Sequence, residues 1–179
     1  MYLPHNIPII SNVFPKRIPV FIEVSKGSKN KYEYNPKAGF LVLDRVLHSS
    51  VVYPFDYGFA PQTICGDGDQ LDVLVMGSIP LIPGCFVNVR PICYIVMEDE
   101  KGVDEKVLSV LDADPNFTHI KNYEDIPSHT LKEISHFFET YKQLEKGKWV
   151  KVGEWKNTKD TYDLIEKTYQ QYMQNQKVI

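Results

Sequence analysis

Short runs of apolar and aromatic residues, separated by turns, dominate the chain as far as residue 111. Their content of valine, isoleucine, leucine, tyrosine and phenylalanine is typical of β-strands. The runs span residues 20–24, 31–34, 40–47, 73–76, 86–97 and 107–111. Glycine, proline and asparagine cluster between them, for example at residues 27–30 and 35–39, and prolines and a glycine predict a shaped loop at residues 51–61. Strands and turns at this spacing predict a small antiparallel barrel or sandwich.

The pattern changes to a helical period after residue 127. Apolar side chains recur three or four positions apart at Leu131, Ile134, Phe138 and Tyr141. Because Ser128 favours a helix start and Gly147 a helix end, we predict a helix over residues 128–146. A second apolar stripe predicts another helix over residues 158–175. The chain is therefore expected to be mainly β with α, in the α+β class.

The length and composition of the chain are typical of a globular protein. With 179 residues, of which 43% are hydrophobic and 24% charged, the chain suits a single domain over residues 1–179. Four prolines within residues 1–19 predict an irregular N-terminal arm. No apolar run is long enough to span a bilayer, and the N-terminus shows no secretory signal.

The net charge and the cysteine content indicate which partners and which cell compartment to expect. The net charge of −3 argues against a broad nucleic-acid-binding surface, although a local basic cluster can still bind phosphate. Cys65, Cys85 and Cys93 are odd in number and lack a C-x-x-C spacing, which indicates a reducing compartment rather than a disulfide framework. We therefore expect a cytoplasmic protein that binds neither a membrane nor nucleic acid.

Three aspartates, Asp67, Asp69 and Asp72, lie within six residues, immediately before the strand predicted at residues 73–76. Gly68 relieves the backbone where the chain bends, so a turn there can bring the three carboxylates together. Left alone, they would repel one another and raise each other's pKa. A hard divalent cation removes this repulsion, because oxygen ligands suit Mg²⁺ or Mn²⁺. A solvated acidic turn is the alternative, and the spacing does not match an EF-hand loop.

Several charged and phenolic residues near this loop have two interpretations each. Lys31 and Glu33 project from one face of their predicted strand, where they either pair across the sheet or face a ligand. Arg45 lies in an otherwise apolar run and needs a partner, since an unpaired buried guanidinium is costly. That partner is either one structural salt bridge or a bound anion. Tyr53 and Tyr57 either pack in their loop or reach a ligand oxygen.

Common catalytic motifs are missing, but two sets of functional residues are present. The histidines form no H-E-x-x-H pattern, and neither G-x-S-x-G nor G-x-x-x-x-G-K-[ST] occurs. Phosphoryl chemistry needs acids to hold metal and cations to neutralise phosphate oxygens. The acids are Glu23, Glu33, Asp67, Asp69, Asp72, Asp99 and Asp104. The basic and phenolic residues are Lys31, Arg45, Tyr53, Tyr57, Lys106, Tyr141 and Lys142.

The segment DGDQLDVLV at residues 67–75 resembles the signature of the soluble family I inorganic pyrophosphatases of the short bacterial type. Further segments follow in that family's order and approximate spacing. They are residues 20–23, 31–33, 44–45, 53–58, 99–106, 136–142 and 146–150. Each motif is moderately specific, whereas the ordered set, which extends over roughly residues 20–155 and so over most of the chain, is highly specific.

The resemblance implies a five-stranded OB-like β-barrel with flanking strands and two C-terminal helices. It also implies hydrolysis of inorganic pyrophosphate to two orthophosphates, with several Mg²⁺ ions per active site and Mn²⁺ or Zn²⁺ as substitutes. A hydroxide between two metals would attack phosphorus in line. The family further implies a homo-oligomer, expected to be a hexamer.

By position, the resemblance assigns Asp67, Asp72 and Asp104 to the first metal, with Asp72 also bridging to the second. Asp69 would be the general base, and Asp99 with Asp104 would bind a metal carried by the substrate. The other roles implied are metal or water contacts for Glu33 and Glu23, phosphate contacts for Lys31, Arg45, Tyr57, Lys106, Tyr141 and Lys142, and support from Tyr53. The residues expected to act in catalysis itself are Asp69, Tyr57, Lys31 and Arg45.

Two positions depart from the family pattern. Gln70 replaces the usual proline, which restores backbone freedom in the acidic loop, and Asp56 stands where a neutral asparagine is expected. Neither change removes a ligand.

The alternative functions are a metal-dependent hydrolase of another phosphoanhydride, such as a nucleoside triphosphate, and a non-catalytic OB-like binding module. Both rank lower, because the chain has no base-binding motif and acids dominate its loops.

Overall fold

The computed structural model of the protein describes residues 4–176. Its strands are β1 (Ile18–Val24), β2 (Asn30–Asn35), β3 (Phe40–Val46), β4 (Asp56–Phe59), β5 (Asp72–Met76), β6 (Phe86–Asp99), β7 (Gly102–Leu111) and β8 (Val150–Lys156). Its α-helices are α1 (Ser128–Thr140) and α2 (Thr158–Gln176). Short 3₁₀ helices, η1 (Pro4–Asn6), η2 (Pro115–Phe117) and η3 (Tyr123–Asp125), lie in the connections.

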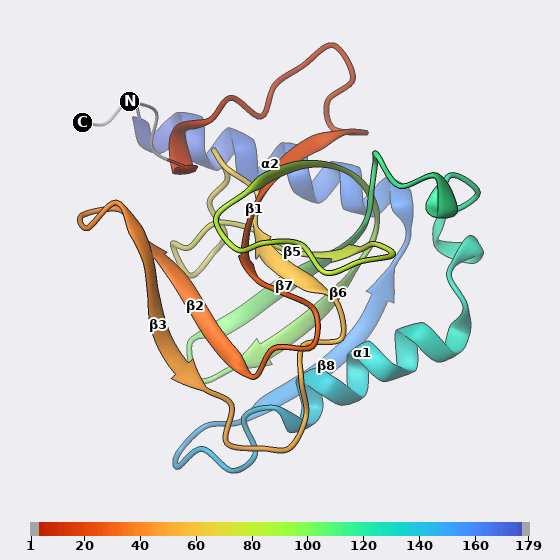
Figure 1. Ribbon diagram of the computed structural model, residues 1–179. Coiled ribbons are helices and arrows are strands. Elements are labelled where there is room, and N and C mark those ends of the chain that lie inside the picture. The colour runs from red at the N-terminus through yellow and green to blue at the C-terminus, as the bar shows by residue number, and fades with distance from the viewer. Residues whose placement is uncertain (1–3, 177–179) are drawn as a thin grey trace.

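Five strands close into a barrel, which Figure 1 shows at the centre of the molecule. Around the ring they follow the order β1, β4, β5, β7 and β6, and the pairing of β6 with β1 closes it. The ring is antiparallel except for the parallel pair β5–β7. β8 pairs with β6 outside the ring. The five-stranded OB-like barrel and the α+β class expected from the sequence are therefore confirmed.

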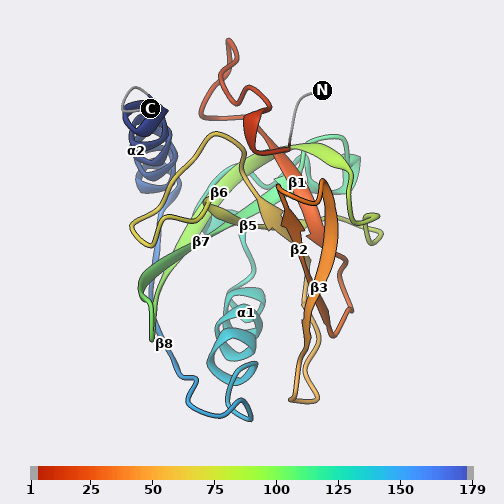
Figure 2. The same ribbon diagram turned by 90° about the vertical axis from the view of Figure 1, so that its left-hand side faces the viewer.

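The remaining elements cover the barrel or stand beside it. β2 and β3 form a separate two-stranded sheet, the β2–β3 hairpin, which stands to one side of the barrel in Figure 2. α1 lies against β8, and α2 lies along β6. Each helix has its own apolar cluster, and alternate residues of β5 enter each. Leu74 joins the α1 cluster and Val73 the α2 cluster, so both faces of β5 are buried and its sequence is apolar throughout.

The irregular loop predicted throughout residues 51–61 was wrong for Asp56–Phe59, which forms β4. Pro54 and Pro61 lie outside the strand, so neither interrupts its pairing with β1 and β5. A strand this short between two prolines has no sequence pattern that distinguishes it from a loop. Within β4, Gly58 lies opposite Ile22 of β1.

Gly58→Ala should destabilise the barrel. A Cβ atom at Gly58 would lie 1.8 Å from the carbonyl oxygen of Phe21 and 2.9 Å from the Cα of Ile22. Because these are backbone atoms of the barrel, we expect the free energy of unfolding in urea to fall by at least about 2 kcal/mol. Gly66→Ala is the control, since its Cβ would meet no atom within 4 Å. Equal losses in the two variants would contradict the steric explanation.

Asp56 joins two loops at the start of β4. Its Oδ1 accepts hydrogen bonds from the backbone N–H groups of Lys26 at 2.8 Å and Leu81 at 3.0 Å. Its Oδ2 is buried and has no hydrogen-bond partner among the described residues. Burial raises the pKa of Asp56, against the lowering effect of the two backbone bonds and of the Lys26 charge. Burial and the Asp56 charge also raise the pKa of the nearby Cys85 thiol.

Asp56→Asn should therefore stabilise the protein at neutral pH. Because the pKa of Asp56 is higher in the folded than in the unfolded chain, the stability it contributes falls as the pH rises between those two values. Asparagine keeps the oxygen acceptor without the buried charge. We expect the free energy of unfolding in urea to rise by about 1 kcal/mol at about pH 8, and the gain to disappear at about pH 4.

Asp114 provides a control of opposite sign for Asp56→Asn. Hydrogen bonds from Ser78 and Asn116 lower the pKa of Asp114. Its charge therefore stabilises the fold above the pKa of the unfolded chain, and this contribution is lost as the pH falls. Asp114→Asn should lose stability at about pH 8 and less at about pH 4. A loss of stability in Asp56→Asn at the higher pH would contradict the interpretation of its buried carboxyl.

The helices begin at the predicted residues but end differently. α2 extends to Gln176, one residue beyond the prediction, whereas α1 ends at Thr140 instead of residue 146. After α1, Gln143 N–H donates to Thr140 O at 3.1 Å and Glu145 N–H to Lys142 O at 2.9 Å. These bonds make consecutive turns, which end at Gly147 with a φ of +76°.

The predicted N-terminal arm is only partly within the described residues, and the single-domain assignment is a separate prediction. Of the arm predicted over residues 1–19, residues 1–3 lie outside the described residues, and β1 already begins at Ile18. That residues 1–179 form a single domain stays a prediction. Within residues 4–176, no helix is both long and apolar enough to cross a membrane.

Candidate active site

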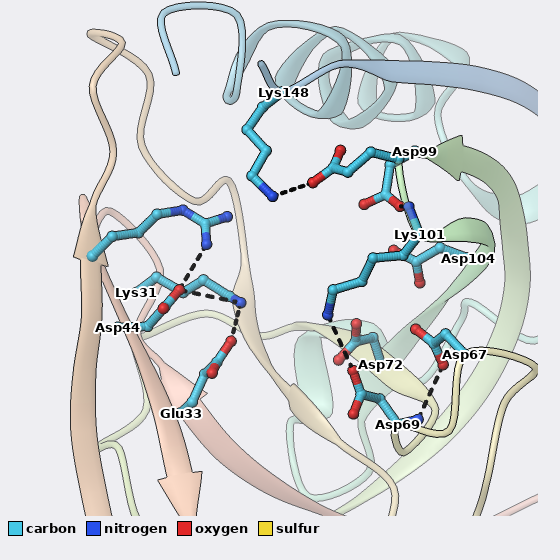
Figure 3. Close-up of polar contacts among 12 residues, drawn as sticks. Lys31, Glu33, Asp44, Asp67, Asp69, Asp72, Asp99, Lys101, Asp104 and Lys148 are labelled. Atoms are coloured by element: carbon cyan, nitrogen blue, oxygen red, sulfur yellow. Dashed lines mark hydrogen bonds and ion pairs between the residues drawn. The ribbon is translucent and has the colours of Figure 1, made fainter. Parts of the chain in front are cut away.

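A cavity of about 750 Å³ is lined by residues of the barrel, the β2–β3 hairpin and the turns after α1. It brings together every candidate residue named from the sequence. These are Glu23, Lys31, Glu33, Arg45, Tyr53, Tyr57, Asp67, Asp69, Asp72, Asp99, Asp104, Lys106, Tyr141 and Lys142. In Figure 3 the charged side chains of the hairpin face those of the acidic loop, β5 and β7 across an open space. The acidic and the basic sets thus meet at one place.

The acidic loop folds back on itself at the edge of this cavity. Cys65 N–H donates to Asp69 O at 2.8 Å, and Gly68 N–H donates to Cys65 O at 3.1 Å. Asp69 N–H also donates to Asp67 Oδ1 at 3.0 Å (Figure 3). The turn depends on Gly68, whose φ of +90° is in the left-handed region. Asp67 and Asp69 are therefore held beside each other, and Asp72 follows at the start of β5.

Lys106 is buried between two carboxylates. In the parallel β5–β7 ladder it lies opposite Asp72, and Asp104 shares its face because the two are two residues apart on one strand. The Nζ of Lys106 pairs with Asp72 and lies 2.6 Å from Asp104 Oδ1. Burial lowers the pKa of Lys106, but the two carboxylates outweigh it and hold this pKa well above its usual value. Burial raises the pKa of Asp104.

Two further lysines contact the acids of this wall. Lys142, just after α1, places its Nζ 2.7 Å from Asp99 Oδ2, and both side chains are buried. Burial alone would raise the pKa of Asp99, but the hydrogen bonds from Lys142 and from Lys101 N–H, together with the nearby lysine charges, lower it. Lys101, from the turn between β6 and β7, lies 3.6 Å from Asp69 Oδ2 in an exposed pair (Figure 3). Asp99, expected to bind a metal, and Asp69, expected to be the general base, therefore each face a cation of the protein.

The β2–β3 hairpin forms the opposite wall. Lys31 pairs with Glu33 and lies 3.7 Å from Asp44 (Figure 3). Arg45, opposite Lys31 in the ladder, lies 2.7 Å from Asp44 and 3.1 Å from Glu145. Burial lowers the pKa of Arg45, but Glu145 and then Asp44 raise it above its usual value. Arg45 thus has structural partners and also lines the cavity, and its expected role as an anion receptor stays a prediction.

Glu23 enters the cavity from a bulge in β1. The β1–β4 register shifts between Ile22 and Val24, and a bulge of this kind turns the side chain of the extra residue in a new direction. Glu23 is 7% exposed and accepts a hydrogen bond from Tyr34 N–H at 2.7 Å. Burial raises the pKa of Glu23 to about 8, and the Tyr34 bond opposes this only in part. The protein alone therefore disfavours the ionised form of this carboxyl.

A group of packed aromatic rings includes the three tyrosines of the cavity. The ring centroids of Tyr53 and Tyr57 are 5.3 Å apart, those of Tyr53 and Phe137 5.0 Å, and those of Phe137 and Tyr141 5.3 Å. These separations are typical of stabilising aromatic pairs. Burial raises the pKa of all three tyrosines, so their hydroxyls remain hydrogen-bond donors. All three tyrosines therefore pack in this aromatic group and also line the cavity.

The acids fit a hard divalent metal by their chemistry, but they do not form a ready-made ligand cluster. Nine carboxylates line the cavity, and carboxylate oxygens are preferred ligands of Mg²⁺. Within residues 4–176, no three histidine, cysteine, aspartate or glutamate side chains are grouped closely enough to hold one ion as they stand. Lysines pair with the carboxylates instead, above all Lys106 with Asp72 and Asp104. A metal ion bound by Asp72 and Asp104 would therefore compete with the Lys106 ammonium for these carboxylates.

Some residues that line the cavity were not predicted from the sequence. Asp44, Glu100, Lys101 and Lys148 lie within motifs that carry the family resemblance, yet no role followed for them from the sequence. Lys148 pairs with Glu100, and both residues line the cavity (Figure 3). His5 also lines the cavity, and its ring centroid lies 5.3 Å from that of Tyr34 and 4.8 Å from that of Phe59. An arm broken by prolines has no periodicity from which this position could be predicted.

Known proteins resemble the chain over most of its length. A family model described as inorganic pyrophosphatase matches residues 20–173. An inorganic pyrophosphatase of Methanosarcina acetivorans is 47% identical over 158 residues, which cover 88% of this chain and 94% of that protein. One of Thermus thermophilus is 48% identical over 160 residues, covering 88% and 91%. The crystal structure of inorganic pyrophosphatase from Thermus thermophilus matches with a TM-score of 0.93 at 44% identity, covering 96% of this chain and 99% of that chain.

Proposed function

This chain belongs to the inorganic pyrophosphatase family, and from that premise we propose that it is an inorganic diphosphatase (EC 3.6.1.1), which hydrolyses pyrophosphate to two orthophosphates. The observation that supports this most strongly is that carboxylates meet lysine, arginine and tyrosine side chains in one cavity. Pyrophosphate is small and highly charged. It therefore needs both metal ions held by acids and direct contacts with cations.

The metal we propose is Mg²⁺, with several ions per active site and with Mn²⁺ or Zn²⁺ as substitutes. The ligands would be carboxylates of the cavity: Asp67, Asp72 and Asp104 for the first ion, Asp72 for the second, Asp99 and Asp104 for an ion that arrives with the substrate, and Glu33 and Glu23 for further ions or their waters. When bound, these ions would lower the pKa of the attacking water and neutralise phosphate charge.

The side chains of the cavity would then complete the reaction. The oxygen of the attacking water forms a bond to one phosphorus as the bridging P–O bond opposite to it breaks. Asp69 takes one proton from this water as general base and returns it to the leaving phosphate, while the other proton stays on the attacking oxygen. The phosphate oxygens would be held by Lys31, Arg45, Tyr57, Lys106, Tyr141 and Lys142, with support from Tyr53. These contacts stabilise the charge that develops on the leaving group.

The protein is further proposed to assemble as a homohexamer. Large apolar side chains are exposed on the described surface, among them Phe40 at 61%, Ile79 at 75% and Ile82 at 78%. Side chains of this kind are often covered by another subunit. Sedimentation equilibrium should give the mass of six chains, and a monomeric mass would contradict this. A cytoplasmic location and the lack of nucleic-acid and membrane partners stay predictions.

A phosphate-release assay with Mg²⁺ that compares pyrophosphate with ATP tests the proposed substrate. We expect kcat/KM for pyrophosphate to exceed that for ATP by orders of magnitude, since every contact proposed for the substrate is made to phosphate. A higher kcat/KM for ATP would contradict the proposal and favour a hydrolase of nucleoside triphosphates.

A further inference from the structure

Arg45 is held by two carboxylates from different parts of the chain. Its Nη1 lies 2.7 Å from Asp44 Oδ2, and its Nε lies 3.1 Å from Glu145 Oε1. Asp44 is its neighbour on β3 and moves with it, whereas Glu145 belongs to the turns that follow α1. Within residues 4–176, the Nη2 of Arg45 has no protein partner. This nitrogen is therefore available to a phosphate oxygen.

The β2–β3 hairpin needs a side-chain link to the rest of the protein, because its strands pair only with each other. No backbone ladder fixes the distance from Lys31 and Arg45 to the acids of β5 and β7. Among the described residues, Arg45–Glu145 is the one salt bridge that joins the hairpin to another part of the chain. Nearer the turn between β2 and β3, Tyr34 N–H donates to Glu23 at 2.7 Å.

Arg45 and Glu145 each need the other's charge, because both side chains are largely buried. The Glu145 side chain is 9% exposed and that of Arg45 24%. The Nε of Arg45 and the Oε1 of Glu145 are both buried, and neither has a hydrogen-bond partner among the described residues. Because a buried charge without a counter-charge is strongly unfavourable, their 3.1 Å ionic contact ties the hairpin to the turns after α1. Tyr141 and Lys142 lie in these same turns.

We infer that Glu145 is a positioning residue for the proposed reaction. It holds the guanidinium of Arg45 at the cavity and thereby fixes the hairpin wall relative to Tyr141 and Lys142. Glu145 is not among the residues that line the cavity, so it acts through Arg45 and not on the substrate. The inference rests on the proposed function, because it takes Arg45 to bind phosphate.

The kinetic test combines Glu145→Ala with Arg45→Ala in a double-mutant cycle. Alone, Glu145→Ala should lower kcat/KM for pyrophosphate by about tenfold or more, because a misplaced binding group is costly. Glu145→Gln keeps the shape and an acceptor oxygen, so it should lose less. In the Arg45→Ala background, Glu145→Ala should have almost no further effect. An unchanged kcat/KM in folded Glu145→Ala, or the same loss without Arg45, would overturn the inference.

Asp112→Ala is a matched control outside the cavity. Asp112 Oδ1 lies 3.3 Å from the Nε of Arg90, and the side chain of Arg90, like that of Arg45, is 24% exposed. This variant removes that ion pair and the pair between Asp112 Oδ2 and Arg17 Nη2 at 2.7 Å, so it should lower the free energy of unfolding and leave kcat/KM close to that of the wild type. If Asp112→Ala lowers kcat/KM as much as Glu145→Ala, the kinetic loss reflects stability alone and the positioning role is rejected.

The Nε–H proton of Arg45 provides a readout that needs no substrate. Its NMR signal, assigned by its loss in Arg45→Lys, should exchange slowly with water in the wild type and in Glu145→Gln. It should exchange rapidly in Glu145→Ala, because the buried partner is gone.

Failure of the proposed function and failure of the positioning role give different results. Absence of pyrophosphate hydrolysis by the wild type rejects the proposed function, whereas an unchanged Arg45 signal in Glu145→Ala rejects the positioning role.

Discussion

Asp72→Ala should lower the turnover of pyrophosphate by about a thousandfold or more, because each metal contact contributes several kcal/mol to the transition state and 1.4 kcal/mol corresponds to a factor of ten. Asp72 begins β5, lies opposite Lys106 in the parallel ladder and lines the cavity. We propose that it contacts two metal ions, so the substitution removes both contacts at once. Initial rates of phosphate release at saturating Mg²⁺ measure the loss, and circular dichroism shows whether the barrel is still folded.

Asp163→Ala is the control for Asp72→Ala. Asp163 is also an aspartate paired with a lysine, since its Oδ2 lies 2.7 Å from the Nζ of Lys159, but this pair is exposed on α2. Surface substitutions of this kind have little effect, and the variant should keep the wild-type rate. Near-normal turnover in Asp72→Ala would show that the proposed metal ligands are wrong.

Lys106→Met should lower both the stability of the metal-free protein and the turnover of pyrophosphate. Methionine keeps the length and flexibility of the side chain but leaves Asp72 and Asp104 without the cation that now lies between them. In the metal-free protein, we expect the free energy of unfolding to fall by about 3 kcal/mol, because breaking a buried ion pair leaves its partners uncompensated. Turnover of pyrophosphate should fall by about a hundredfold, since the phosphate loses a charged donor.

Mg²⁺ should raise the Tm of Lys106→Met more than that of the wild type. In the wild type, a bound ion would compete with the Lys106 ammonium for Asp72 and Asp104, whereas in the variant these carboxylates lack that partner and should bind the ion more tightly. Tighter binding to the folded state gives a larger rise in Tm at the same metal concentration. Thermal unfolding with and without Mg²⁺ measures the difference.

Lys159→Met is the control, because this lysine is 81% exposed and its removal should leave the response to Mg²⁺ unchanged. A smaller rise in Tm for Lys106→Met than for the wild type would contradict competition between the ammonium and the metal ion.

The features that sequence reasoning predicted correctly depend on neighbouring residues. The acidic loop and the strand after it were predicted because Gly68 marks a turn and an apolar run follows. The strand at residues 107–111 was also predicted, although β7 already begins at Gly102 and so includes Asp104 and Lys106. The helix starts at Ser128 and Thr158 were predicted from the residue types there and from the apolar period, and at α2 Asn157 Oδ1 accepts from Asp160 N–H at 3.0 Å. Such signals need only a short window of sequence.

The features that were missed depend on contacts between distant segments. Nothing local to residues 72 or 106 indicates that β5 and β7 pair in parallel and bring Asp72 to Lys106. The bulge that turns Glu23 into the cavity is a property of the β1–β4 pairing. β4 itself is held by its two neighbours and not by its own short, proline-flanked sequence.

Arg45 shows the same limit most clearly. Its place in an apolar run indicates that the guanidinium needs a partner. The sequence does not identify that partner, because Glu145 lies in turns where the helix was predicted to continue. Only the early end of α1 at Thr140 allows the chain to turn and bring Glu145 to the hairpin.

The central claim is that the carboxylates of this cavity serve the reaction through bound metal ions. It is tested most directly by the initial rate of phosphate release from pyrophosphate as Mg²⁺ is added back to exhaustively chelated protein. We predict no measurable turnover without metal and a saturable recovery as Mg²⁺ is added. Full turnover after chelation would contradict the claim.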